Sequence, residues 1–285
     1  MRTVRIQNVA IGPDKPLAVI AGPCMAESLE QCSRIGETMR DRCAELGIGY
    51  IFKASFDKAN RTSIHSKRGP GLRQGLEWLA EVGRRLGVPV TTDVHQPDQC
   101  APAAKHVDLL QIPAFLCRQT DLLIAAAETG RAVNVKKGQF LSPREMSSVV
   151  QKLIESAADH PGILLTERGT FFGYHQLVND FIGLGDLMDL GWLVCFDVTH
   201  STQLPGGSAH GETCVTGGRP DRAPLLARAA VAAGVQAVFI ETHTNPAEAL
   251  SDGATMLPLE QTLSLLGDLV AIRGCVVSAI GASSV

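Results

Sequence analysis

Side chains that can act as acids, bases or anion ligands recur where short apolar runs of the sequence end. Eight such runs are rich in β-branched and other apolar residues, and reactive side chains end or closely follow each of them. In chain order these side chains are Cys24, Lys53, Asp93 with His95, Gln111, Lys136 with Lys137, Glu167 with Arg168, Asp197 with His200, and Glu241 with His243. One of them alone could be a solvated strand end. Their recurrence predicts that they meet in one place.

Cations gather after the second of these runs. Lys53, Lys58 and Arg61 lie close together there, with Asn60 and Ser63 between or beside them. Phosphate binds where hydrogen-bond donors accompany positive charge. A basic loop by itself is more often simply solvated. Further cations follow other runs, at Arg118, Lys136 and Arg168. Cations that face one another need an anion between them, so we expect a ligand with more than one anionic group.

Four residues are of the types that bind a divalent transition metal. Cys24, His200, Glu241 and Asp252 follow the first, seventh and eighth runs, and a thiolate, an imidazole and two carboxylates suit Zn²⁺, Fe²⁺ or Mn²⁺. Alternatives remain at this point: Cys24 could be a packing residue, and Asp252 could stabilise a turn. The spacing is too scattered to be a compact motif.

The elements that would position these residues alternate between strands and helices. The strand candidates are 17–21, 50–53, 88–93, 108–112, 132–136, 163–166, 193–197 and 237–241. The helix candidates are 29–46, 72–86, 121–128, 143–156, 223–233 and 259–272. This alternation predicts parallel βαβ units, and eight of them favour a (β/α)₈ barrel over an open doubly wound sheet, which stays an alternative. Active sites of such barrels lie at the C-terminal strand ends.

We expect one domain over residues 1–285. Residues 1–16 precede the first unit and are expected to form a short strand or hairpin that caps the bottom of the barrel. A long glycine-rich segment, 205–218, has the character of a lid.

Composition limits the function classes. The net charge of −3 argues against a nucleic-acid partner, and no apolar stretch reaches the roughly 20 residues of a membrane span. The eight cysteines form no C-x-x-C pair, and the N-terminus does not have the pattern of a secretory signal. We therefore expect a reduced, cytoplasmic enzyme with no membrane partner.

Several long motifs resemble one enzyme family. They are residues 52–63 (FKASFDKANRTS), 68–71 (RGPG), 111–121 (QIPAFLCRQTD), 134–140 (NVKKGQF), 166–169 (TERG) and 196–201 (FDVTHS). Together they resemble the signature of 3-deoxy-manno-octulosonate 8-phosphate synthases, over about residues 18–259. The resemblance implies a barrel enzyme, usually a homotetramer, that joins phosphoenolpyruvate, arabinose 5-phosphate and water into a lipopolysaccharide precursor and releases phosphate.

The resemblance also implies roles for single residues. Phosphoenolpyruvate would be held by Lys53, Lys58, Lys136 and Arg168, and the aldose phosphate by Asn60 and Arg61, with Arg118 reaching a neighbouring subunit's site. Ser63 and Gln111 are further expected substrate ligands. The residues expected to take part in catalysis are Lys58, Asn60, Asp93, His200 and Asp252.

The family has a metal-free branch with Asn after the first strand and a metal-dependent branch with Cys there. The run AGPC at 21–24 resembles the second branch, which implies a divalent metal held by Cys24, His200, Glu241 and Asp252.

Two alternatives and two departures accompany this interpretation. A related heptulosonate-phosphate synthase would use erythrose 4-phosphate, but its usual KPRTS differs from KANRTS at 58–63. A non-catalytic sugar-phosphate-binding barrel would not need the metal ligands. Residues 244–246 (TNP), in the loop that leads to Asp252, and 216–221 (TGGRPD) depart from the family pattern.

Overall fold

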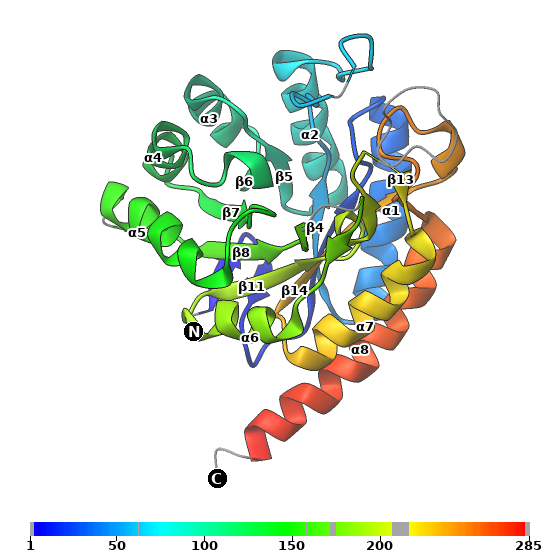
Figure 1. Ribbon diagram of the computed structural model, residues 1–285. Coiled ribbons are helices and arrows are strands. Elements are labelled where there is room, and N and C mark those ends of the chain that lie inside the picture. The colour runs from blue at the N-terminus through cyan, green and yellow to red at the C-terminus, as the bar shows by residue number, and fades with distance from the viewer. Residues whose placement is uncertain (1–2, 62, 158, 172–174, 207–216, 283–285) are drawn as a thin grey trace.

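Eight parallel strands close into a barrel in the computed structural model, which describes residues 3–282 except 62, 158, 172–174 and 207–216 (Figure 1). In chain order these strands are β3 (Ala18–Gly22), β4 (Gly49–Lys53), β5 (Val90–Asp93), β6 (Leu109–Ile112), β7 (Ala132–Lys136), β8 (Ile163–Glu167), β11 (Leu193–Asp197) and β14 (Ala237–His243). Each pairs with the next, and β14 pairs with both β11 and β3. The predicted (β/α)₈ barrel is confirmed, and the open sheet is wrong.

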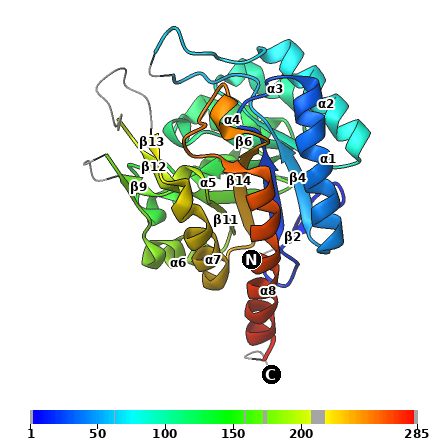
Figure 2. The same ribbon diagram turned by 90° about the vertical axis from the view of Figure 1, so that its right-hand side faces the viewer.

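Helices on the outside follow each strand of the barrel (Figures 1 and 2). They are α1 (Leu29–Glu45), α2 (Leu72–Leu86), α3 (Pro97–Ala104), α4 (Thr120–Glu128), α5 (Met146–Ser156), α6 (Phe181–Asp189), α7 (Ala223–Ala233) and α8 (Leu259–Ala282). The sequence prediction missed α3 and α6. Both are short and contain poor helix formers, Pro102 in α3 and Gly183 and Gly185 in α6, so tertiary packing rather than propensity decides them.

Local signals set several helix ends. The Ser28 side chain accepts a hydrogen bond from the backbone N–H of Gln31 at 3.1 Å and so caps α1. Gly87 ends α2 with φ +65°, a left-handed conformation that favours glycine. Ser142, just before the predicted helix 143–156, forms a capping box with Glu145, and residues 143–145 form a 3₁₀ turn before α5 begins.

Two layers of apolar side chains enclose the strands. The larger core lies between the strands and the outer helices, and includes Phe52, Val194 and Leu266. The smaller one fills the inside of the barrel at its lower end, around Ile20 and Phe239. Because both faces of each strand are buried, the strands consist largely of continuous apolar runs.

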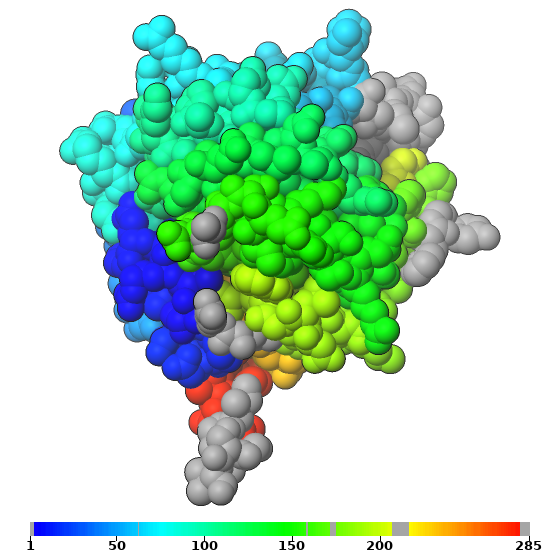
Figure 3. Space-filling model, turned by 90° about the vertical axis from the view of Figure 1, so that its left-hand side faces the viewer, coloured from blue at the N-terminus to red at the C-terminus, as the bar shows by residue number. Residues whose placement is uncertain are grey.

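The N-terminal residues form an antiparallel hairpin of β1 (Val4–Ile6) and β2 (Val9–Ile11). Its inward side chains belong to the same apolar cluster as the lower barrel interior. The approach is close, because a Cβ added at Gly49 would lie 2.6 Å from Cγ1 of Val9. In Figure 3 the blue N-terminal segment lies on the surface beside the yellow-green part of the chain. The hairpin therefore lies where the expected barrel cap would be.

We expect Ile11→Ala to lower the free energy of unfolding by about 2–5 kcal/mol, because Ile11 is fully buried in this cluster. Chemical denaturation with an unchanged m-value measures this loss. Arg5→Ala, on the exposed side of the same hairpin, is the matched control and should change stability little. Equal free energies of unfolding for the two variants would show that packing of the hairpin against the barrel does not contribute to stability.

Helix α8 is longer than the prediction, which ended at residue 272. Within the described residues it is also the one helix that is long and apolar enough to cross a membrane. The stretch in question is Leu259–Ala279, and 28% of its most apolar part is buried. It packs against α7 and α1, and Leu265, Leu266 and Leu269 on it belong to the larger core. Its last turns extend beyond the barrel (Figure 2).

Candidate active site

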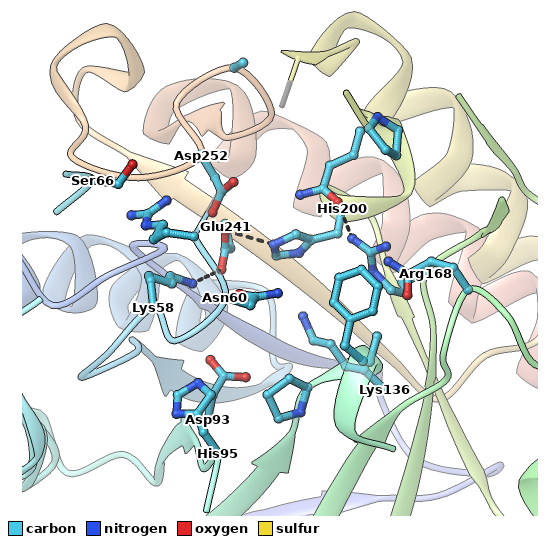
Figure 4. Close-up of a pocket in the computed structure, with 18 of the residues that line it drawn as sticks. Lys58, Asn60, Ser66, Asp93, His95, Lys136, Arg168, His200, Glu241 and Asp252 are labelled. Atoms are coloured by element: carbon cyan, nitrogen blue, oxygen red, sulfur yellow. Dashed lines mark hydrogen bonds and ion pairs between the residues drawn. The ribbon is translucent and has the colours of Figure 1, made fainter. Parts of the chain in front are cut away.

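A cavity of about 1130 Å³ opens at the C-terminal ends of the barrel strands (Figure 4). Most of the predicted site residues line it, although strands and loops far apart in the sequence carry them. They are Lys53, Lys58, Asn60, Arg61, Ser63, Asp93, Lys136, Arg168, His200, Glu241 and Asp252. The parallel strands thus bring the reactive strand ends together, as the recurring pattern indicated.

Buried lysines and carboxylates alternate on the floor of the cavity. Lys53 Nζ lies 2.6 Å from Oε1 of Glu241, and it donates to the backbone oxygen of Cys24 at 3.1 Å. Asp93 Oδ2 is 3.7 Å from the same ammonium. Burial by itself would raise the pKa of Glu241 and of Asp93, but the neighbouring lysines outweigh it and hold both pKa values below their usual range. Both carboxylates are therefore ionised at neutral pH.

A second ion pair lies across the barrel. Lys136 Nζ is 2.6 Å from Oδ2 of Asp197, and the same carboxylate oxygen is 2.8 Å from Nδ1 of His200. Burial would raise the pKa of Asp197, but His200 and Lys136 hold it well below its usual range. Asp197 was predicted as a reactive strand end but was given no role in the site. It orients His200 so that Nε2 of the imidazole points toward Glu241, 3.4 Å from Oε2.

Arg168 is a buried cation of the cavity lining, and no carboxylate lies within salt-bridge distance of it in the described part of the chain. One of its terminal nitrogens donates to the side-chain oxygen of Gln203, and the other, Nη1, has no hydrogen-bond partner there. Burial lowers the pKa of the guanidinium, which is 4% exposed, but an arginine stays charged. A buried charge is costly unless it is paired, so we expect an anionic ligand to bind this guanidinium.

The loop after β4 supplies the outer cations. Lys58 approaches Glu241 Oε1 at 3.8 Å, and its own backbone N–H is held by Arg68 O at 2.8 Å. Arg61 donates to the backbone oxygens of Lys67 at 3.0 Å and Leu250 at 3.4 Å. These contacts connect the loop after β4 with the loop after β14. Figure 4 shows Lys58 and Asn60 on the same side of the cavity as Glu241.

Three of the four predicted metal ligands form a cluster. One ligand atom each from Cys24, Glu241 and Asp252 lies within 4.8 Å of the other two. Cys24 Sγ donates to Oδ2 of Asp252 at 2.9 Å, and Oε2 of buried Glu241 has no hydrogen-bond partner within the described residues. The fourth, His200, stands beside the cluster, next to Glu241. Asp252 lies in this cluster, with φ +49°, although residues 244–246 of the loop that leads to it depart from the family pattern.

The charge of this cluster suits a cation. Burial raises the pKa of the Cys24 thiol well above its usual value, and the Asp252 and Glu241 carboxylates raise it further. A divalent ion would favour the thiolate and would neutralise carboxylates that otherwise repel one another.

Three predicted residues lie outside the cavity lining. Cys24 is buried, 1% exposed, beneath Asp252. Gln111 is fully buried below the floor, where its amide donates to Asp93 at 2.6 Å, so it does not face the cavity as a substrate ligand would. Arg118 is exposed on the loop after β6. Lys137, which shares a strand end with Lys136, points away and pairs with Glu167 at 3.5 Å.

His95, predicted as a reactive strand end without a role, also lines the cavity. Three lining residues were not predicted: Phe115, Gln139 and Gln203. Uncharged polar and aromatic side chains carry little signal by themselves. The predicted lid lies largely outside the described residues. Its described base is a short ladder between β12 (Gln203–Leu204) and β13 (Gly217–Gly218).

A parallel barrel with a cationic cavity at its C-terminal strand ends defines a class: (β/α)₈ enzymes that act on phosphorylated substrates. A family model described as "DAHP synthetase I family" matches residues 2–271, and the chain belongs to this family.

Curated relatives cover nearly the whole chain. A protein of Cyanothece sp. is 53% identical over 95% of this chain and 98% of its own. One of Desulfatibacillum aliphaticivorans is 52% identical over 93% and 95%, and one of Brucella melitensis 50% identical over 94% and 95%. All three are named 2-dehydro-3-deoxyphosphooctonate aldolase. The family resemblance found in the sequence motifs is confirmed.

Proposed function

We propose that this protein is a 3-deoxy-manno-octulosonate 8-phosphate synthase, the activity that its relatives' name, 2-dehydro-3-deoxyphosphooctonate aldolase, also denotes. It would condense phosphoenolpyruvate with arabinose 5-phosphate and water, forming the eight-carbon sugar acid phosphate and inorganic phosphate. The observation that carries this proposal is the buried Arg168, whose Nη1 has no partner within the described residues. It faces a cavity whose other lysine and arginine side chains are Lys53, Lys58, Arg61 and Lys136.

The residues of the site divide into two groups. Arg168 and Lys136 lie on one side of the cavity. Together with Lys53 and Lys58 they would bind the phosphate and the carboxylate of phosphoenolpyruvate. Asn60, Arg61 and Ser63 lie on the outer loop and would hold the phosphate of the aldose. Fixing both substrates at reacting distance replaces a collision in solution and accounts for much of the rate.

The reaction changes the charge at two atoms, the aldehyde oxygen and carbon C2 of phosphoenolpyruvate. Carbon C3 of the enol phosphate attacks the aldehyde carbon, which leaves negative charge on the aldehyde oxygen. Water adds to the electron-poor C2 and gives up a proton, and the C2–O bond to phosphate then breaks, so that a ketone and inorganic phosphate form. Fixed positive groups stabilise the developing negative charge without reorganising. Asp93 and Glu241, both ionised, can each accept a proton but cannot donate one at neutral pH.

A divalent metal fits the cluster of Cys24, Glu241 and Asp252, and His200, which lies beside Glu241, would be its fourth ligand. When bound, such an ion supplies Lewis acidity next to the reacting aldehyde and water. The unpartnered Oε2 of Glu241 and the two carboxylates around one thiol support this assignment. Zn²⁺, Fe²⁺ and Mn²⁺ all accept this ligand set.

Release of phosphate from phosphoenolpyruvate is expected to require arabinose 5-phosphate and to be far weaker with erythrose 4-phosphate. The loop KANRTS at 58–63 and the names of the relatives favour the five-carbon aldose. A coupled phosphate assay with each aldose measures this. Equal turnover with both would support the heptulosonate synthase, and no turnover with either would support a non-catalytic sugar-phosphate-binding barrel.

We further propose that the protein is cytoplasmic and assembles as a homotetramer. Arg118 is exposed, and its guanidinium has no partner within the described residues, so it is available to a neighbouring subunit's site. Light scattering coupled to size exclusion would measure the assembly, and Arg118→Ala would test the contribution across subunits.

A further inference from the structure

A row of hydrogen-bonded side chains crosses the barrel just below the cavity floor. It runs over four neighbouring strands, β5 to β8, one residue from each. Gln111 donates to Asp93 Oδ1 at 2.6 Å, Asn134 donates to Gln111 Oε1 at 3.0 Å, and Thr166 donates to Asn134 Oδ1 at 2.6 Å. Gln111, Asn134 and Thr166 are fully buried, and only Asp93 reaches the cavity.

Every hydrogen bond in this row points the same way. An ionised carboxylate only accepts, so Gln111 must turn its NH₂ toward Asp93 and its oxygen toward Asn134. Asn134 must then turn its own NH₂ toward Gln111, and its oxygen accepts a hydrogen bond from the Thr166 hydroxyl. Aligned hydrogen bonds polarise one another and strengthen where water is excluded.

The row also determines how Asp93 is placed. Its Oδ1 is taken by Gln111, while its Oδ2 accepts from Ser55 and lies 3.7 Å from Lys53 Nζ. Without the donor on Oδ1, the carboxylate would be free to rotate toward the lysines of the cavity. The hydrogen bonds of the row offset the cost of burying its polar groups, but apolar side chains could fill this layer without any such cost.

We propose that Asn134 and Thr166, which do not touch the cavity, are positioning residues that fix Asp93 for the reaction. They act through Gln111, by holding its amide in the one orientation that donates to the carboxylate. This inference rests on the proposed synthase activity.

The test is Asn134→Leu, which keeps the side chain's size and removes both of its hydrogen bonds. We expect kcat to fall about 10- to 100-fold, the scale of a misplaced group at a site. The KM values should stay close to those of the wild type, because Asp93, being negative, does not bind anionic substrates. A crystal structure of the variant should show the Asp93 carboxylate rotated from its wild-type position.

Two further changes separate positioning from packing. Thr166→Val removes only the first hydroxyl of the row and should lower kcat less than Asn134→Leu, while Thr166→Ser should restore it. Thr92→Val is the matched control, because the Thr92 hydroxyl is equally buried on β5 but has no hydrogen-bond partner in the described chain. It should leave kcat unchanged.

The outcomes are distinguishable. A wild-type kcat per folded molecule in both Asn134→Leu and Thr166→Val, or an equal loss in Thr92→Val, would overturn the positioning role. If Asn134→Leu does not fold, the comparison of Thr166→Val with Thr166→Ser decides. If the wild type itself shows no turnover, the proposed synthase activity fails, and the orientation of Asp93 in the crystal structures still tests the row.

Discussion

Arg168→Ala is expected to lower kcat/KM for phosphoenolpyruvate by roughly 30- to 5000-fold. Removing one partner of a buried charge contact costs on the order of 2–5 kcal/mol, and each factor of ten corresponds to about 1.4 kcal/mol. The loss should be large because the guanidinium is 4% exposed and no carboxylate lies within salt-bridge distance in the described residues. Steady-state kinetics with varied phosphoenolpyruvate at saturating aldose measures the loss.

Two variants sharpen this test. Arg168→Lys keeps the charge but loses the planar donor pair, so it should recover only part of the activity. Arg228→Ala removes an arginine from the outer surface of α7, where it pairs with Asp268 at 2.7 Å, and should leave kcat/KM unchanged. Wild-type kinetics for Arg168→Ala would mean that the guanidinium takes no part in substrate binding.

Chelation is expected to abolish most of the activity, and Mn²⁺, Fe²⁺ or Zn²⁺ should restore it. Cys24→Ala should lose metal, measured directly by elemental analysis, while its unfolding transition stays cooperative. The metal and the proton compete for the thiol, whose pKa is raised by burial and by Asp252 and Glu241. Metal affinity should therefore fall as the pH falls, with roughly one additional proton taken up per ion released.

Controls for the metal prediction lie within the same chain. Cys32→Ala changes a thiol equally buried on α1 and should retain both metal and activity. Cys24→Asn introduces the residue of the metal-free branch and tests whether the chain can be active without metal. Whether or not this variant is active, it should bind no metal. Full activity of the native enzyme with no bound metal would return Cys24 to a packing role.

The strands of the barrel could be predicted from the sequence because their signal is local. Each is a short apolar run ended by polar residues, so eight strand candidates and their parallel order followed without knowledge of tertiary contacts. Two helices could not be predicted in this way. Helix α3 contains Pro102 and helix α6 contains two glycines, so both depend on packing against neighbouring elements.

The residue types of the site were also determined by the sequence. Cations, carboxylates and a cysteine at strand ends indicated an anionic ligand and a metal, and long motifs indicated the family. Tertiary structure decided which of these side chains face the cavity. Lys136 faces it and Lys137 does not, because successive side chains of a strand point to opposite faces.

Depth within the barrel was likewise decided only by the fold. Gln111 lies one layer below the floor, and the ion pair of Asp197 with Lys136 forms only when their strands belong to the same barrel. A sequence specifies which residue ends a strand, but strand tilt and register set its height and its neighbours. Contacts between residues far apart in the chain, such as Asn134 with Thr166, exist only once the barrel has closed.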